Sequence, residues 1–77
     1  MAQSPKSFAE RLHQCLDEMG APQPTRERAV VLSKMLSIPK QYAWGLLEGQ
    51  QKPDQALLTS MAQEFEVDPS WLSGEMS

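Results

Sequence analysis

The sequence lacks several residue types on which other protein classes depend. It contains one cysteine, Cys15, so no disulfide can form within the chain. It contains one histidine, His13, and no cluster of metal-ligating side chains at a suitable spacing. No apolar run approaches the roughly 20 residues that a transmembrane helix needs. We therefore expect no disulfide framework, no membrane span, no metal and no cofactor.

The same shortages argue against an enzyme. A catalytic thiol needs a base beside it, and His13 lies two residues from Cys15, on a different face of any helix. The sequence also lacks a glycine-rich phosphate loop and a plausible nucleophile–base pair. Its first residues lack the basic end and apolar core of a secretory signal. We expect a cytoplasmic, non-enzymatic protein in which Cys15 is a buried or half-buried free thiol.

What the chain does contain is sufficient for one small core. Its 77 residues are 40% hydrophobic, which predicts a folded chain with one domain over residues 1–77 and a flexible arm over 1–6. No segment alternates with period two, so strands are not expected. The fold class predicted is all-α.

Apolar residues spaced near 3.6 predict five helices with short connections. Residues suited to a helix start precede or open them: Ser7, Thr25, Pro39, Asp54 and Asp68. Ser7 and Glu10 have the spacing of a capping box. The apolar stripes predict a core that includes Phe8, Leu12, Cys15, Leu16, Met19, Ala29, Leu32, Leu36, Ala43, Leu46, Leu47, Leu57, Leu58, Met61, Ala62 and Phe65.

The net charge of −3 is unevenly distributed. Between Arg26 and Lys52 the chain carries five cations and two carboxylates, a net +3, and the remainder carries −6. Local charge density governs contact with phosphate more than the total charge does. The segment therefore suits nucleic acid, although an ordinary solvated surface of the same charge is the alternative.

The stretch LSKMLSIPKQYAWGLLEGQQKP, residues 32–53, is the most informative part of the chain. Its first apolar-patterned segment ends at Leu36, and its second, after a short turn, runs from Lys40 to Glu48 and stops at Gly49. Two short helices joined by a tight turn have the layout of a helix-turn-helix, whose second helix can enter the major groove of DNA. We predict this motif at about residues 26–48.

Three stretches make the chain resemble the lambda-repressor-like DNA-binding domains of phage and bacterial regulators. They are FAERL at 8–12, the turn, recognition helix and following loop at 36–53, and FEVDPSWLSGE at 65–75. The resemblance implies a compact five-helix domain. It also implies a transcriptional regulator, a repressor of phage, prophage or bacterial type, that binds a double-stranded DNA operator in the bacterial cytosol or an infected host cell.

The chain departs from the family pattern at four positions of this motif. Ser37 stands where glycine is common, and Pro39 where serine or threonine is common. Trp44 and Gly45 occupy positions that are often polar. These departures bear on base recognition and leave the fold expectation intact.

The resemblance assigns the base-facing positions to the start of the second helix of the motif. These positions are Lys40 and Gln41, with Trp44 one turn later on or near the same face. Lysine can donate to guanine O6 and N7, and glutamine can pair with adenine N6 and N7. Trp44 suits a thymine methyl or a sugar, and packing on a neighbouring helix or partner subunit is the alternative.

The resemblance places phosphate contacts on either side of this helix. The candidates are Arg26, Arg28, Tyr42, Gln50 and Lys52. Tyr42 equally suits a place at the edge of the core.

A short recognition helix favours a homodimer that binds two half-sites. Trp71, Leu72 and Met76 are candidates for its interface, although closing the intramolecular core is the favoured alternative for Trp71. The second functional hypothesis is a protein–protein interaction module that keeps the fold and has lost DNA binding; the acidic composition, Trp44 and Gly45 favour it.

Overall fold

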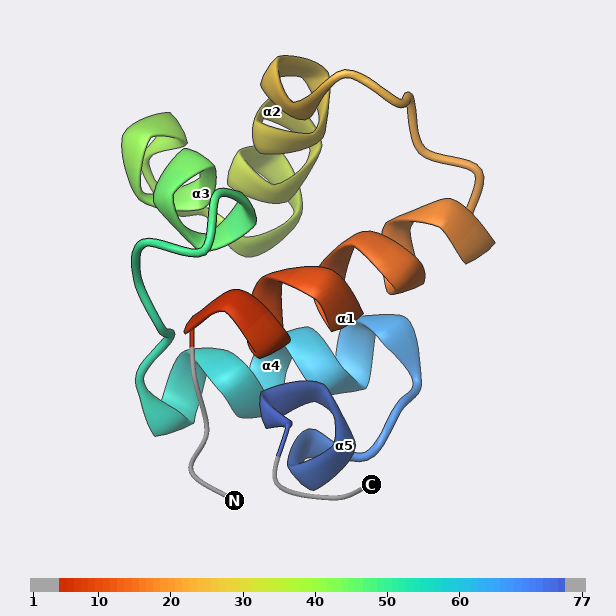
Figure 1. Ribbon diagram of the computed structural model, residues 1–77, viewed down its shortest axis with the longest axis vertical. Coiled ribbons are helices and arrows are strands. Elements are labelled where there is room, and N and C mark those ends of the chain that lie inside the picture. Colours follow the sequence, from red (N-terminus) through yellow and green to blue (C-terminus); the bar gives the residue numbers. More distant parts are fainter. Residues whose placement is uncertain (1–4, 75–77) are drawn as a thin grey trace.

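The computed structural model describes residues 5–74 and contains five helices (Figure 1). They are α1 (Pro5–Glu18), α2 (Thr25–Leu36), α3 (Lys40–Leu47), α4 (Gln55–Phe65) and α5 (Pro69–Ser73). No strand occurs within these residues, so the all-α, five-helix expectation is confirmed. Helix α1 takes in residues 5 and 6, which the sequence assigns to an arm, and residues 1–4 lie outside the described part.

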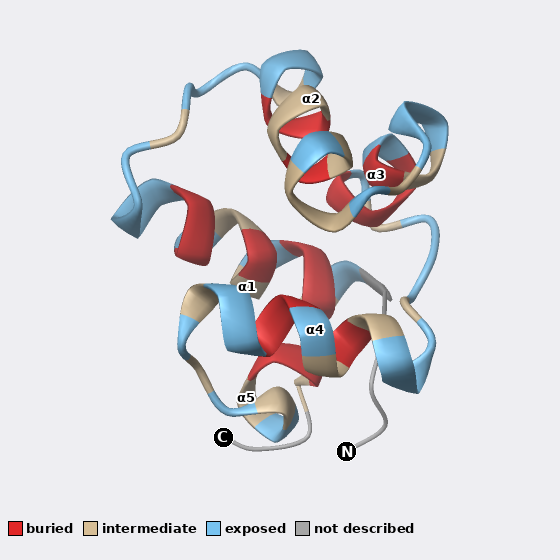
Figure 2. Cartoon of the chain, turned by 180° about the vertical axis from the view of Figure 1, so that it is seen from behind, coloured by how far each residue is buried: buried red, intermediate tan, exposed pale blue. Residues whose placement is uncertain are grey.

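Helix α1 runs through the middle of the molecule, with α2 and α3 on one side and α4 and α5 on the other (Figures 1 and 2). Helices α2 and α3 pack together, as do α4 and α5, and α1 contacts both α3 and α5. Each helix contributes to one continuous core. The largest fully buried side chains are Phe8, Leu12, Leu16, Leu32, Leu46, Met61 and Leu72.

Two of the predicted helix starts are confirmed by side-chain caps. The Asp54 carboxylate accepts the backbone N–H of Leu57 at 2.8 Å at the start of α4. The Asp68 carboxylate accepts the N–H of Ser70 at 2.8 Å, and Pro69 occupies the first turn of α5, where its missing N–H removes no helical bond.

The starts of the first two helices differ from the sequence prediction. Helix α1 begins at Pro5, so Ser7 lies within its first turn and the predicted capping box with Glu10 does not mark its start. In α2, Pro24 holds the cap position with an extended backbone and makes no side-chain cap bond, and Thr25 is already helical. Proline fixes φ at a value compatible with both positions, which lets it open a helix.

The predicted core is largely confirmed, with an exception at the end of α1. Met19 is 50% exposed because it follows the last helical residue, Glu18, where the chain turns away from the core. Leu36, Leu57 and Phe65 are half-buried and pack against the core from its edge. Within residues 5–74, no helix has the length and apolar character needed to cross a membrane.

Candidate nucleic-acid interface

The turn between α2 and α3 is held by Ser33. Its carbonyl accepts the backbone N–H groups of Ser37 and Ile38, and its hydroxyl donates to the Ile38 carbonyl at 2.7 Å. Ser37 itself has φ 57°, the left-handed conformation that lets a helix end abruptly. Sequence reasoning missed Ser33, which fixes the path of the chain into α3 from both sides of the turn.

Helix α3 has a buried face and an exposed face. Ala43, Leu46 and Leu47 are buried against the core, while Pro39 precedes the helix with φ −62° and ψ 146°. The exposed residues of α3 and its C-cap are Lys40, Gln41, Trp44 and Glu48. The helix therefore presents the three predicted base-facing side chains together, in the solvent-accessible position that base contact requires. Glu48 lies at the C-terminal end of this exposed face, and the sequence analysis did not assign its carboxylate to the site.

Trp44 is 40% exposed and separates two hollows on this surface. One hollow, of about 260 Å³, lies toward α2. The other, of about 540 Å³, lies toward the loop after α3 and is lined by Tyr42, Gly45 and Gln50 among others. Trp44 and Gln41 line both hollows. Trp44 is partly exposed and lies beside residues of α2, so the structure leaves both base contact and packing on a neighbouring helix or a partner subunit open.

Gly45 is buried beside the side chain of Gln51. A Cβ at position 45 would meet the Gln51 amide nitrogen, and it would lie 3.2 Å from the amide carbon. The close neighbour of this mid-helix glycine is thus a side chain of the following loop. That contact draws Gln51 against α3 and forms part of the wall of the larger hollow.

The predicted phosphate-contacting residues do not all lie together. Arg26 is exposed at the start of α2 and lines the same hollow as Lys40. Tyr42 is half-buried against the core, yet it lines the larger hollow with Gln50. Lys52 is exposed but lines a separate hollow with Phe8 and Ser73. Arg26, Tyr42 and Gln50 therefore flank the exposed face of α3, and Lys52 is placed apart from it.

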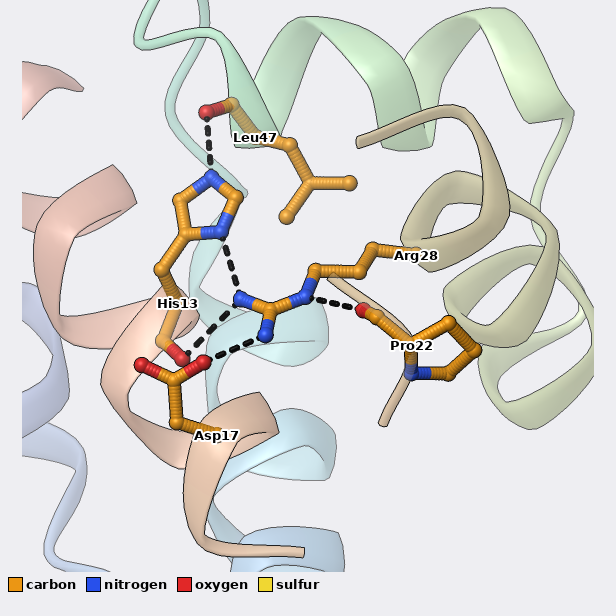
Figure 3. A network of polar contacts seen from close by, with 5 residues as sticks. All are labelled: His13, Asp17, Pro22, Arg28 and Leu47. Carbon is orange, nitrogen blue, oxygen red and sulfur yellow. Dashed lines mark hydrogen bonds and ion pairs between the residues drawn. The ribbon is translucent and has the colours of Figure 1, made fainter. Parts of the chain in front are cut away.

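Arg28 is not available to phosphate, contrary to the sequence prediction. Its side chain is buried, at 2% residue exposure, and spans from α2 to α1 (Figure 3). It forms an ion pair with Asp17, donates through Nε to the Pro22 carbonyl at 2.6 Å, and lies 2.9 Å from His13 Nδ1. A guanidinium with this many internal acceptors ties α1, the following loop and α2 together.

The same contacts fix the proton position on His13. A guanidinium can only donate, so His13 Nδ1 accepts from Arg28 and Nε2 carries the proton. Nε2 then donates to the carbonyl of Leu47, the last residue of α3, at 3.1 Å (Figure 3). His13 therefore joins the end of α3 to α1. It is a positioning residue for the candidate recognition helix that sequence reasoning did not identify.

The burial of Arg28 changes the local charge of the segment. Without it, four cations and two carboxylates remain between residues 26 and 52, a net +2 instead of +3. Arg26 and Lys40, which line one hollow, bring two of the four cations to the same place. The surface around α3 remains the cationic part of an acidic chain.

Of the predicted dimer residues, Leu72 and Trp71 lie within the part of the chain that the structure describes, and both pack in or against the core. Leu72 is fully buried in the core, so its assignment to a dimer interface is wrong. Trp71 is half-buried against the core, and the Arg11 guanidinium lies 4.9 Å from its ring centroid and donates to its carbonyl. Met76 lies outside the described residues. The intramolecular alternative for Trp71 is the arrangement that the structure has.

Cys15 is a buried free thiol, as the sequence predicts. Burial, and to a lesser extent the negative charge of Glu18, raises the pKa of the Cys15 thiol above its ordinary value of 9.0. A thiol of this kind is largely protonated at neutral pH and is a poor nucleophile. Within the described residues, no group of three or more His, Cys, Asp or Glu side chains is placed to hold a metal ion.

Comparison of the chain with models of protein families, with curated proteins and with solved structures gives no match.

Proposed function

We propose that this chain is a sequence-specific DNA-binding transcriptional regulator, of the repressor type, which inserts α3 into the major groove of double-stranded DNA. The observation that carries the proposal is the exposed face of α3, where Lys40, Gln41 and Trp44 lie together directly after a tight turn. An α-helix with its side chains is about 10–12 Å in diameter, which matches the width of the major groove.

The residues of this face have complementary tasks in the proposed complex. Lys40 donates to guanine O6 and N7, and Gln41 pairs with adenine N6 and N7. Arg26, beside Lys40 at the start of α2, contacts a phosphate and so fixes the register of the protein on the duplex. The resemblance to lambda-repressor-like domains supports these roles and a location in the bacterial cytosol or an infected host cell.

The proposed regulator acts as a homodimer on two half-sites about one DNA turn apart. One eight-residue recognition helix offers few base contacts, and two copies on a symmetric operator double them. With Leu72 buried, Trp71 and Met76 are the candidates that remain for the dimer contact.

Binding of the purified protein to the DNA upstream of its own coding sequence tests the proposal. We expect binding at low salt that weakens as salt rises, and we expect Lys40→Ala and Gln41→Ala to change the sequence preference. Lys6→Ala and Gln14→Ala are matched controls, because both residues are exposed on α1. No binding at low salt would refute the regulator proposal, and unchanged preference in both α3 variants would refute the assignment of α3.

A protein–protein interaction module on the same fold is the second candidate. The partly exposed indole of Trp44 and the reduced local charge of +2 favour it. Such a module would bind no duplex at low salt, and Trp44→Ala would abolish binding to its protein partner while Met19→Ala, also at an exposed apolar residue, would not.

A further inference from the structure

The smaller hollow beside Trp44 combines apolar and cationic residues. It lies between the first turn of α2 and the start of α3 and has a volume of about 260 Å³. Its lining residues are Arg26, Ala29, Val30, Lys40, Gln41 and Trp44. Ala29 is buried and Val30 half-buried, whereas Trp44 and the three polar residues are exposed, so Ala29 and Val30 lie deeper than the cations.

This arrangement suits a small apolar group that is attached to a polyanion. Apolar side chains at the bottom of a hollow contribute little binding free energy when the ligand is a phosphate or a sugar. Two cations at its edge contribute little when the ligand is neutral. The major groove of DNA presents one apolar group at the base edges, the C5 methyl of thymine, between two lines of phosphates. The charge of Arg26 and Lys40 and the apolar residues below them are complementary to that combination.

We infer that this hollow recognises thymine by its C5 methyl group, with Trp44 and Val30 as the side chains that contact the methyl. The inference rests on the proposed DNA-binding function and names the base that this part of the surface prefers. Gln41 lines the same hollow and can pair with the adenine of the same or an adjacent base pair. The two contacts together select A·T pairs at this position of each half-site.

Uracil provides the sharpest test, because it differs from thymine by the methyl group alone. Preferred duplexes are first selected from a random pool with the full chain. Each thymine of the best duplex is then replaced in turn by uracil, and the dissociation constant is measured at one salt concentration. Burial of one methyl group changes affinity by about fourfold, so one position per half-site is expected to lose about that factor.

Two variants connect the uracil effect to the hollow. Trp44→Ala removes the partly exposed indole, and we expect thymine and uracil duplexes then to bind equally well at the sensitive position. Met19→Ala is the matched control, because Met19 is also an exposed apolar residue and lies at the end of α1. It is expected to keep the full uracil effect.

The outcomes separate this inference from the proposed function. Duplex binding that no uracil substitution weakens overturns the thymine assignment and leaves DNA binding standing. A uracil effect that survives Trp44→Ala shows that the methyl is read elsewhere and also overturns the assignment. Absence of duplex binding at low salt overturns both the thymine assignment and the proposed DNA-binding function. The hollow is then explained as a binding site for an apolar side chain of a protein partner.

Discussion

At the scale of single residues, Arg26 and Arg28 show how two neighbouring arginines acquire different roles. Residues two apart on a helix point to different faces, so both cannot lie on the same exposed surface. Arg26 is exposed beside Lys40, and Arg28 is buried against α1. One is a candidate DNA contact, and the other holds the fold together.

Replacement of Arg28 by methionine tests this division. We expect Arg28→Met to lower the free energy of unfolding by about 2–3 kcal/mol, because the Pro22 carbonyl and His13 Nδ1 lose their buried donor. The ion pair adds less, since the Asp17 side chain is 56% exposed. Urea denaturation provides the measurement, and Arg26→Met is the control, expected within about 0.5 kcal/mol of wild type. Equal stability of all three proteins would contradict the network.

The position of Arg28 in the sequence indicates its burial, although its charge suggests a place on the surface. Arg28 lies one helical turn before Leu32, so the core stripe of α2 passes through both positions. The apolar residues Val30 and Val31 blur that stripe, which leaves the rotation of α2 about its axis undefined by sequence. The acceptors come from α1 and the loop, and their proximity to Arg28 is a tertiary property.

The raised pKa of Cys15 predicts a pH dependence of stability. The unfolded chain has a thiol of ordinary pKa near 9.0, so it loses the proton before the folded protein does. The folded state then binds more protons, so the contribution of Cys15 to stability is constant below about pH 9 and falls as the pH rises further. Denaturation at pH 7 to 10 is expected to show a smaller decline in Cys15→Ala than in wild type. Parallel declines in the two proteins would contradict the prediction.

At the scale of secondary-structure elements, the sequence predicts the starts of α4 and α5 and the end of α2, and it misplaces the starts of α1 and α2. Asp54 and Asp68 are correctly predicted as caps because a cap bond joins residues two or three apart. The end of α2 depends on Ser33, whose hydroxyl reaches the Ile38 carbonyl once the turn has formed. The sequence contains no local rule that distinguishes this serine from an exposed one.

The left-handed Ser37 that ends α2 predicts a stabilising substitution. At φ 57° the left-handed conformation is unfavourable by about 1 kcal/mol for a residue with a Cβ, and it is not unfavourable for glycine. We expect Ser37→Gly to raise the free energy of unfolding by about 0.5–1 kcal/mol in a thermal or urea melt. Ser60→Gly is the matched control, because Ser60 is exposed within α4, where glycine weakens a helix by a similar amount. A loss of stability in both variants would contradict the role of Ser37.

At the scale of the whole molecule, the cationic face of α2 and α3 belongs to an acidic protein. The chain carries −3 overall, and residues 26–52 carry +3, or +2 when the buried Arg28 is left out. The all-α class follows from the periodicity of the sequence. The strength of the proposed DNA binding does not follow from the sequence, because it depends on which cations remain exposed after folding.

The salt dependence of binding measures how many cations contact phosphate. Each contact contributes about −0.9 to the log–log slope of affinity against salt concentration. We expect Arg26→Ala to make the slope shallower by about 1 for a monomer on DNA and by about 2 for a dimer. Sedimentation of the free protein and of the complex gives the stoichiometry independently. Lys6→Ala is the control, and a slope that Arg26→Ala leaves unchanged would contradict the placement of Arg26 at the phosphates.

The two tryptophans of this protein lie on opposite sides of α1 and in different surroundings. Trp44 is 40% exposed on α3, and Trp71 is half-buried on α5 under the Arg11 guanidinium. The two tryptophan fluorophores of the protein consequently respond to separate events. When Trp71 is replaced by phenylalanine, the emission maximum comes from Trp44 and shifts when a ligand covers the exposed face of α3. With Trp44 replaced instead, the remaining emission responds to unfolding of the α4–α5 side.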